Sequence, residues 1–165
     1  MITQEELIKF VSYNPYTGLF TRIKSKRSDT VGKEIMSVNN TGYIFARING
    51  KKYLGHRLAW VYMYGEIPDG LHIDHINHIR TDNRIENLRL VTNSENHKNR
   101  KLEKNSSGHT GICWKKANKN WEVYINSNGE RIYLGVYKDL NDAILVRKKA
   151  EKQYNFHENH GKKDI

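Results

Sequence analysis

Near the amino terminus, apolar residues recur at the spacing of a helix. Thr3 and Glu6 have the spacing of a capping box, in which each side chain bonds a backbone N–H group at the helix start. The apolar residues that follow share one helical face: Leu7, Phe10 and Val11. The pattern predicts a short opening helix, which the turn-forming sequence over 14–18 ends.

The next pattern is that of a hairpin followed by a second helix. An Asn-Gly pair at 49–50, the strongest short-range hairpin signal, separates two strand-like runs, 42–48 and 51–54. Residues 56–64 then carry apolar side chains at helical spacing, and Gly65 supplies a stop. We expect a twisted antiparallel pair and then a helix.

From Leu71 onward the sequence becomes dense in His, Asn, Asp and Arg. Within this polar region, residues 88–91 alternate between apolar and polar as a strand does. Thr92 and Glu95 repeat the capping-box pattern and open a helix that runs through Asn96, Asn99 and Arg100. Strand, loop, strand and helix are thus expected in this order.

A linker-like stretch at 104–108 precedes a second module. Three strands are expected after it, at 111–114, 121–126 and 131–136, with a tight turn at 128–129. A helix follows, capped by Asn141 or Asp142, and its apolar face consists of Ala143, Val146, Ala150 and Tyr154. Strand alternation places Trp121, Val123 and Ile125 against that helix and leaves an open face with Tyr124, Asn126, Arg131 and Tyr133.

Charge and composition limit the classes of binding partner that the chain is expected to have. Among 165 residues, 28 Lys and Arg outnumber 18 Asp and Glu, which gives a net charge of +10. Such a chain favours a polyanionic partner, and nucleic acid is the first candidate. On composition alone, a solvated basic surface without such a partner is about equally good an explanation. Cys113 is the one cysteine, so neither an intramolecular disulfide nor a cysteine-built zinc site is expected.

The run His72-Ile73-Asp74-His75 carries the candidate chemistry. Cleavage of a phosphodiester needs a nucleophilic water, a base and a cation. Asp74 offers a carboxylate for the cation, His75 an imidazole that titrates near neutrality, and the helical Asn96 a neutral oxygen. Neighbours on a regular strand point to opposite faces, so Asp74 and His75 converge only where the strand ends or bends. Alternation otherwise pairs Asp74 with His72, which keeps His72 as an alternative ligand.

Together these residues resemble a known family. The pattern Asp74-His75, Asp82-Asn83, Asn87-Leu88-Arg89, Val91-Thr92, Glu95-Asn96 and Asn99 is similar to the β-β-α-metal motif of HNH endonucleases, above all those of bacteriophages and their introns. The resemblance implies that His75 is the general base and that Asn87 braces the loop through backbone hydrogen bonds. It implies that Asp74 and Asn96 bind one divalent cation, Mg2+ or alternatively Mn2+. Many relatives have His in place of Asn96, and His97 stands next to it, but the helical period favours Asn96.

The carboxyl-terminal module resembles the ethylene-response-factor (Apetala-type) DNA-binding domain, through Ser107-Gly108, Gly111-Ile112, Trp121-Glu122-Val123, Leu134-Gly135 and Ala143. Phage HNH enzymes often carry this module after the nuclease. A sheet in the major groove reads bases with polar and aromatic side chains, while lysines hold phosphates. The residues expected to contact DNA are Arg57, Lys51, Lys52, Asn99, Arg100, Lys115, Lys116, Tyr124, Asn126, Arg131 and Tyr133.

These patterns predict an α+β protein with three parts. They are a β-rich DNA-contacting scaffold (1–52), the nuclease (53–103), and a linker with the DNA-binding domain (104–165). We expect a site-selective, homing-type endonuclease on double-stranded DNA, acting as a monomer that nicks one strand, because no coiled-coil stripe is apparent. No apolar run is long enough to span a membrane, so the expected location is the cytoplasm, of the host bacterium if a phage encodes the protein. The alternative is a non-cleaving DNA-binding regulator.

Overall fold

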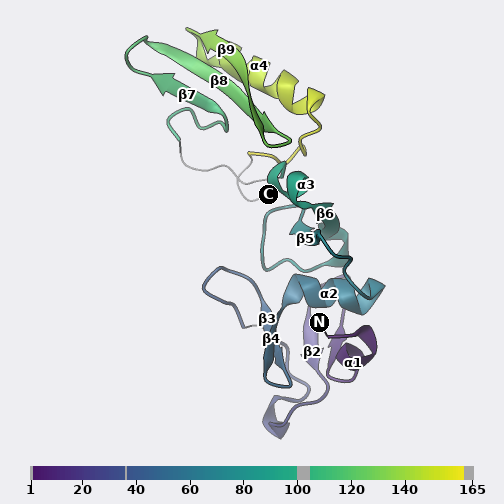
Figure 1. Ribbon diagram of the computed structural model, residues 1–165. Coiled ribbons are helices and arrows are strands. Elements are labelled where there is room, and N and C mark those ends of the chain that lie inside the picture. The colour runs from purple at the N-terminus through teal and green to yellow at the C-terminus, as the bar shows by residue number, and fades with distance from the viewer. Residues whose placement is uncertain (1, 36, 100–104, 162–165) are drawn as a thin grey trace. The chain divides into compact units, whose positions relative to one another are not determined.

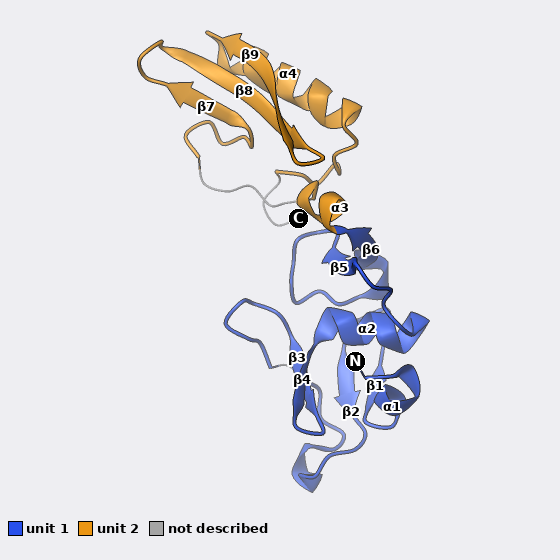
Figure 2. Cartoon of the chain, in the orientation of Figure 1, with its two compact units in different colours: residues 1–92 blue, residues 93–165 orange. Residues whose placement is uncertain are grey.

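The computed structural model describes residues 2–35, 37–99 and 105–161, which form two compact units. Unit 1 comprises residues 1–92 and unit 2 residues 93–165 (Figure 1, Figure 2). The break in packing therefore comes at 92/93, whereas the sequence places boundaries at 52/53 and 103/104. The two units are defined by contacts between residues, whereas the three predicted parts are defined by sequence motifs. The three-part division therefore stays a prediction.

Unit 1 opens with α1 (Gln4–Ile8), and the Thr3 hydroxyl accepts a hydrogen bond from the Glu6 N–H at 3.2 Å. The opening helix is confirmed, but it ends before Val11. That residue begins β1 (Val11–Tyr13), which pairs antiparallel with β2 (Phe20–Arg22). Both Val11 and Phe20 are buried. β-Branched and aromatic residues such as these favour strands, which agrees with the pairing of β1 and β2. A short 3-10 helix, η1 (Ser28–Thr30), follows β2.

The predicted hairpin is present as β3 (Phe45–Ile48) and β4 (Lys51–Leu54). Its turn residues Asn49 and Gly50 have φ values of 49° and 80°, as a two-residue hairpin turn requires. The second predicted helix is α2 (Gly55–Tyr64), which Gly65 ends by donating its N–H to the Val61 carbonyl. Leu58, Ala59 and Val61 of α2 are buried in the core of unit 1.

The last part of unit 1 is a two-stranded sheet, β5 (Leu71–His75) and β6 (Leu88–Thr92), with η2 (Ile85–Asn87) just before β6. The strands pair antiparallel and in regular register, with Asp74 opposite Arg89 and His75 opposite Leu88. Ile73 and Leu88 are buried in the core of unit 1. The polar loop between the strands, residues 76–87, is therefore anchored at both ends to a packed sheet.

Unit 2 begins with α3 (Asn93–His97) and continues as a sheet of β7 (Ile112–Lys115), β8 (Asn120–Ser127) and β9 (Glu130–Tyr137) in the order β7-β8-β9. Helix α4 (Leu140–Gln153) lies along this sheet, as Figure 1 shows. The three strands and the turn at 128–129 are as predicted. The cap differs: the Asp139 carboxylate accepts hydrogen bonds from the N–H groups of Asn141 and Asp142, since those residues already lie inside the helix.

One face of the unit 2 sheet packs on α4. Val123 and Ile125 of β8 are fully buried, as the alternation predicts, together with Ala143 of α4. The helix face is not wholly apolar, because Arg147 lies between Ala143 and Ala150 at 4% exposure. Its guanidinium donates to the Tyr124 carbonyl at 2.7 Å and pairs with Glu151 at 2.9 Å, so its charge is satisfied inside the unit.

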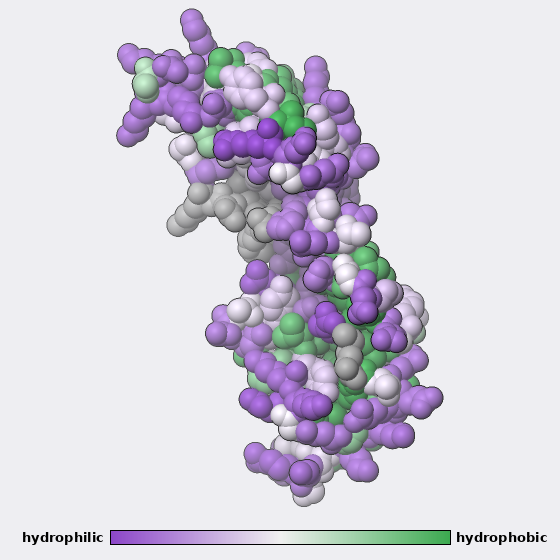
Figure 3. Space-filling model, in the orientation of Figure 1, coloured by the Kyte–Doolittle hydropathy of each residue, from purple (hydrophilic) through white to green (hydrophobic). Residues whose placement is uncertain are grey.

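The other face of the sheet is open, as predicted. Tyr124 lies opposite Tyr133, and Asn126 opposite Arg131, so all four side chains share this face. Tyr133 is 60% exposed, and the Arg131 guanidinium lies 3.7 Å from the centre of the Tyr124 ring. The face seen in Figure 3 is mostly hydrophilic over both units. Within the described residues, every helix is too short or too polar to cross a bilayer.

Candidate active site and nucleic-acid interface

His75 is the last residue of β5, and its side chain is only 5% exposed. Its Nε2 lies 3.2 Å from Oδ1 of Asn83. An amide oxygen can only accept a hydrogen bond, so Nε2 carries the hydrogen and the lone pair of the neutral ring is on Nδ1. Burial lowers the pKa of His75, while the Asn83 hydrogen bond and the nearby Asp74 oppose that shift. The ring is therefore held in one tautomer and favours the neutral form.

The amino-terminal segment holds Asn83 in place. Asn83 is 1% exposed, and its backbone carbonyl accepts a hydrogen bond from the Tyr13 hydroxyl at 2.7 Å. A Cβ atom on Gly18 would lie 2.7 Å from the Asn83 carbonyl carbon and 2.6 Å from the Arg84 nitrogen. A Cβ on Gly55 would lie 2.7 Å from Nδ2 of Asn83. Two glycines thus leave the space into which the loop beside His75 packs.

A buried aromatic cluster lies against the other side of His75. The His56 and His75 rings meet edge to face with centroids 5.0 Å apart, and Tyr43 lies 5.0 Å from His56. His56 is 7% exposed, and burial, followed by the charges of His75 and Arg57, lowers the pKa of His56 to about 3. The sequence assigns His56 no role. Its spacing of three from Ala59, on the buried face of α2, is the signal that identifies it as internal.

Asp74 is paired across the sheet with Arg89. Both hydrogen bonds end on Oδ2, from Nη2 at 2.9 Å and from Nε at 3.1 Å. The pairing is regular through His75, the last residue of β5, so Asp74 and His75 alternate up to the end of the strand, one of the two places where the sequence expects them to converge. His72 is exposed and stays the alternative ligand by alternation. Arg89 belongs to the sequence motif, but its contact with Asp74 depends on the register of two strands and does not follow from the motif.

Asn87 braces the loop between the strands. Its Oδ1 accepts from the Asn77 N–H at 3.0 Å, and its Nδ2 donates to the Asp82 carbonyl at 2.8 Å. These are backbone hydrogen bonds of the kind that the resemblance implies for Asn87. Asp82 in turn binds Arg84 through both carboxylate oxygens, and these hydrogen bonds lower the pKa of Asp82. The loop is therefore fixed by side chains rather than by regular structure.

The helix α3 carries the remaining residues of the motif. Asn96 lies within it, so the two expected cation ligands, Asp74 and Asn96, belong to different units. Asn99, which the sequence predicts as a DNA contact, is 3% exposed. Its burial could not be predicted from the polarity of its side chain alone. Arg100 lies outside the described residues.

The donor set fits a hard divalent cation. Among the described residues, no group of three or more His, Cys, Asp and Glu side chains is placed to hold a metal ion. Asp74 contributes one carboxylate, a hard oxygen donor. Mg2+ commonly binds one or two protein carboxylates and takes its other ligands from water and substrate phosphates. One carboxylate with one amide oxygen, from Asn96, matches that requirement.

The expected DNA-contacting cations differ in their surroundings. Lys51, Lys52 and Lys116 are exposed, and the Lys52 ammonium lies 4.0 Å from the centre of the Phe45 ring. Arg57 is half-buried in α2. Lys115 forms an ion pair with Glu122 at 2.9 Å, which raises the pKa of Lys115 and offsets its charge. Lys115 is thus a weaker candidate for a phosphate contact than its neighbour.

Comparison of the chain with known protein families identifies the motif around Asp74 and His75. Residues 53–98 match the family model of the HNH endonucleases. The chain contains an HNH endonuclease domain. The matched segment includes Asp74, His75, Asn87 and Asn96, and it ends one residue before Asn99. The resemblance stated from the sequence is therefore confirmed for the HNH domain, while nothing tests the ethylene-response-factor resemblance of the carboxyl-terminal module.

Several relatives share parts of the chain. Protein 3.8 of Escherichia phage T7 is 35% identical over 77 residues, covering 46% of this chain and 64% of that protein. A mimivirus protein (Acanthamoeba polyphaga mimivirus), named as an uncharacterized HNH endonuclease, is 25% identical over 125 residues, covering 76% and 65%. An SPbeta prophage protein of Bacillus subtilis (strain 168), named as an HNH homing endonuclease, is 36% identical over 55 residues, covering 33% and 32%.

One solved structure, of DNA binding and cleavage by the HNH homing endonuclease I-HmuI, is 29% identical and covers 50% of this chain and 47% of that chain, with a TM-score of 0.39. The chain spans just under two thirds of the first two relatives and about a third of the prophage protein.

Proposed function

We propose that the protein is a divalent-metal-dependent endonuclease that hydrolyses phosphodiester bonds in double-stranded DNA. The match of residues 53–98 to the HNH endonuclease model carries this proposal. Within that segment lie a base, a carboxylate and an amide of the kinds that phosphodiester hydrolysis needs: His75, Asp74 and Asn96. The net charge of +10 supports a polyanionic substrate.

In the proposed mechanism, His75 accepts a proton from the attacking water at Nδ1. The hydrogen bond between Nε2 and Asn83 fixes the tautomer that leaves Nδ1 basic, and Asn87 holds the loop that carries Asn83. Asp74, oriented by Arg89, and Asn96 would hold the cation. When bound, the cation would neutralise charge on the phosphate and on the departing oxygen. The other residues named here, Asn83, Asn87 and Arg89, position the base and the carboxylate.

We further propose that one chain nicks one strand at a selected site. One Asp-His-Asn set cannot reach two antiparallel scissile phosphates at once, so a double-strand break would need a dimer or a second binding event. The open face of the unit 2 sheet, with Tyr124, Asn126, Arg131 and Tyr133, is the proposed reader of the site. The homing type is the proposed subtype, and the host cytoplasm the proposed location.

The decisive experiment is incubation of the purified protein with a supercoiled plasmid that bears a mapped target, in Mg2+, in Mn2+ and in EDTA. The expected result is open-circular DNA in either metal and intact plasmid in EDTA. Intact plasmid under all conditions would refute the endonuclease and favour the alternative, a non-cleaving DNA-binding regulator. Linear product that appears together with open circles would refute nicking by a monomer.

Variants assign the roles within the site. Asp74→Ala should weaken metal binding, measured by calorimetry with Mn2+. His72→Ala is the matched control, because His72 is an exposed residue of the same strand. If His72→Ala lowers metal affinity as much as Asp74→Ala does, His72 is a ligand.

A further inference from the structure

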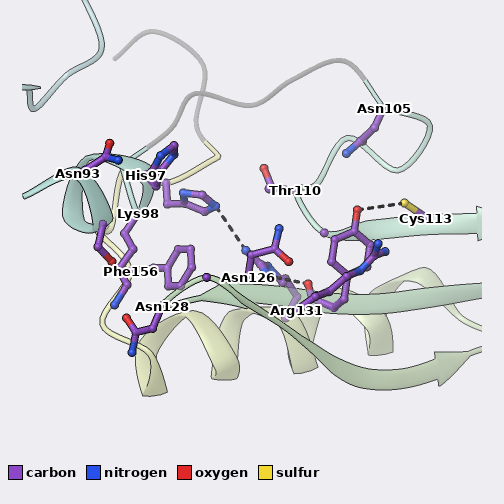
Figure 4. A pocket seen from close by; sticks show the side chains of 16 residues that line it. Asn93, His97, Lys98, Asn105, Thr110, Cys113, Asn126, Asn128, Arg131 and Phe156 are labelled. Carbon is purple, nitrogen blue, oxygen red and sulfur yellow. Dashed lines mark hydrogen bonds between the residues drawn. The ribbon is translucent and has the colours of Figure 1, made fainter.

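Unit 2 contains a large cleft. Its volume is about 1240 Å³. Its lining comes from α3 with the residue after it, the segment before β7, the sheet with its turn at 128–129, α4, and the segment that follows α4. Figure 4 shows Lys98 and Phe156 on one side, Cys113 on the other, and Asn126 between them, below Thr110. A concave site of this size could hold more than one nucleotide-sized group.

The cleft is electropositive. Among the described residues that line it there is no Asp or Glu, while Lys98, Arg131 and Arg147 all contribute to it. Arg147 is paired with Glu151, but no ion pair within the described part of the chain involves Lys98 or Arg131. Two cations without a carboxylate partner, facing one concavity, favour an anionic ligand.

Neutral groups hold both cations in position. The Lys98 ammonium donates to the Tyr154 carbonyl at 2.8 Å and lies 5.7 Å from the centre of the Phe156 ring. Arg131 lies 3.7 Å above the Tyr124 ring. Contacts of this kind limit the motion of a long side chain and leave its charge available, so less entropy is lost when a phosphate binds.

Amide side chains supply most of the other polar groups. Asn93, Asn105, Asn126 and Asn128 line the cleft from different elements, and each carries both a donor and an acceptor. Asparagine can bond the edge of a base through both atoms at once. The floor is rigid, because Arg147 joins α4 to the Tyr124 carbonyl of β8. Cations for phosphates and amides for base edges therefore lie in one concavity.

We propose that this cleft binds a single strand of DNA, with phosphates at Lys98 and Arg131 and unpaired bases at the asparagines. Bases in a duplex are stacked and paired, so their edges reach groups inside a concave cleft only after the strand has separated or a base has turned out. The proposal rests on the proposed function for its choice of DNA as the ligand. It gives Asn126 and Arg131 of the open sheet face a second mode of contact, alternative to the groove of a duplex.

The test measures binding of the full chain, in EDTA, to a fluorescent single-stranded oligonucleotide and to the duplex of the same sequence. Lys98→Gln and Arg131→Gln should each weaken single-strand binding about 3-fold to 10-fold and reduce the salt dependence by about 0.7 for each lost phosphate contact. Lys148→Gln is the matched control, since Lys148 is an exposed lysine of the same unit that does not line the cleft. Lys98→Arg, which keeps the charge, should retain affinity.

Unchanged single-strand affinity in Lys98→Gln and Arg131→Gln would overturn the proposal, as would an equal loss in Lys148→Gln. A loss confined to duplex binding would also overturn it. Thermal melting of each variant identifies one that has lost its fold, and the Lys98→Arg result then decides. Because EDTA prevents metal-dependent cleavage, binding is measured whether or not the protein cuts DNA, so failure of the nuclease proposal gives a separate result.

Discussion

Lowering the pH should destabilise unit 1 through His56. This ring is 7% exposed and lies against His75 and Tyr43, and burial lowers the pKa of His56 to about 3 from its usual 6.5. Between those values the unfolded chain binds a proton at this site and the folded chain does not, so protonation favours unfolding. The contribution of His56 to stability is therefore fully present above pH 6.5 and is lost as the pH falls towards 3.

The size of the effect follows from the two pKa values. Each pKa unit corresponds to about 1.4 kcal/mol, so at pH 5.0, 1.5 units below 6.5, the free energy of unfolding should be about 2 kcal/mol smaller than at pH 7.5. His75 shifts in the same direction and adds to the loss. His56→Phe keeps an aromatic ring in the cluster but cannot titrate, so the variant should lack the His56 share.

Urea unfolding at pH 7.5 and pH 5.0 measures this difference. Trp60 lies in unit 1, whereas Trp114 and Trp121 lie in unit 2, so a background with Phe at 114 and 121 makes fluorescence report on unit 1. Titrating groups that do not interact with His56 act equally in parent and variant, and they cancel when the two pH dependences are subtracted. If His56→Phe loses as much stability as the parent on acidification, His56 is not a buried neutral group and the reasoning fails.

Three further predictions concern the site and its support. His75→Ala should lower turnover about 10²-fold to 10⁴-fold with little change in DNA affinity, and single-turnover cleavage alongside a binding titration checks this; near-parental cutting would show that the base is misassigned. Asn83→Ala removes the acceptor for His75 Nε2 and should reduce cleavage about 10-fold to 100-fold while metal affinity stays constant; unchanged rates would show that Asn83 does not set the tautomer. Gly18→Ala places a Cβ 2.6 Å from the Arg84 nitrogen at a φ of 72°, so unfolding in urea should show a loss of about 2 kcal/mol or more, whereas Gly32→Ala, with a similar φ of 77° and open space around it, should lose less.

Elements with strong local signals could be predicted from the sequence. The Asn-Gly turns at 49–50 and 128–129, and the stop at Gly65, depend on residues that tolerate positive φ, and all are present. The strands β1 and β2 have three residues each, too few for a period to be visible. Asp139 was missed as a cap because the neighbouring Asn141 and Asp142 have equally good capping chemistry.

In the candidate site, too, some residues could be predicted from the sequence and others could not. Asp74, His75, Asn87 and Asn96 follow from motif spacing, because the family resemblance orders them along the chain. Their supporting residues do not follow from spacing. Arg89 contacts Asp74 only in one strand register, and His56 reaches His75 from a helix 19 positions earlier in the sequence. Such contacts depend on tertiary packing, which no local pattern encodes.

Gly18 and Tyr13, which pack beside Asn83, set a lower limit on the size of a chain that could carry out the proposed cleavage. The matched motif begins at residue 53, yet the loop beside its histidine is held by the Tyr13 hydroxyl and by the backbone of Pro15, whose carbonyl accepts from the Ile85 N–H at 3.1 Å. A gene fragment cut at the motif boundary would lack both of these hydrogen bonds. Transferring the proposed cleavage activity to another protein, by recombination or by design, should therefore require about the first 20 residues together with the motif.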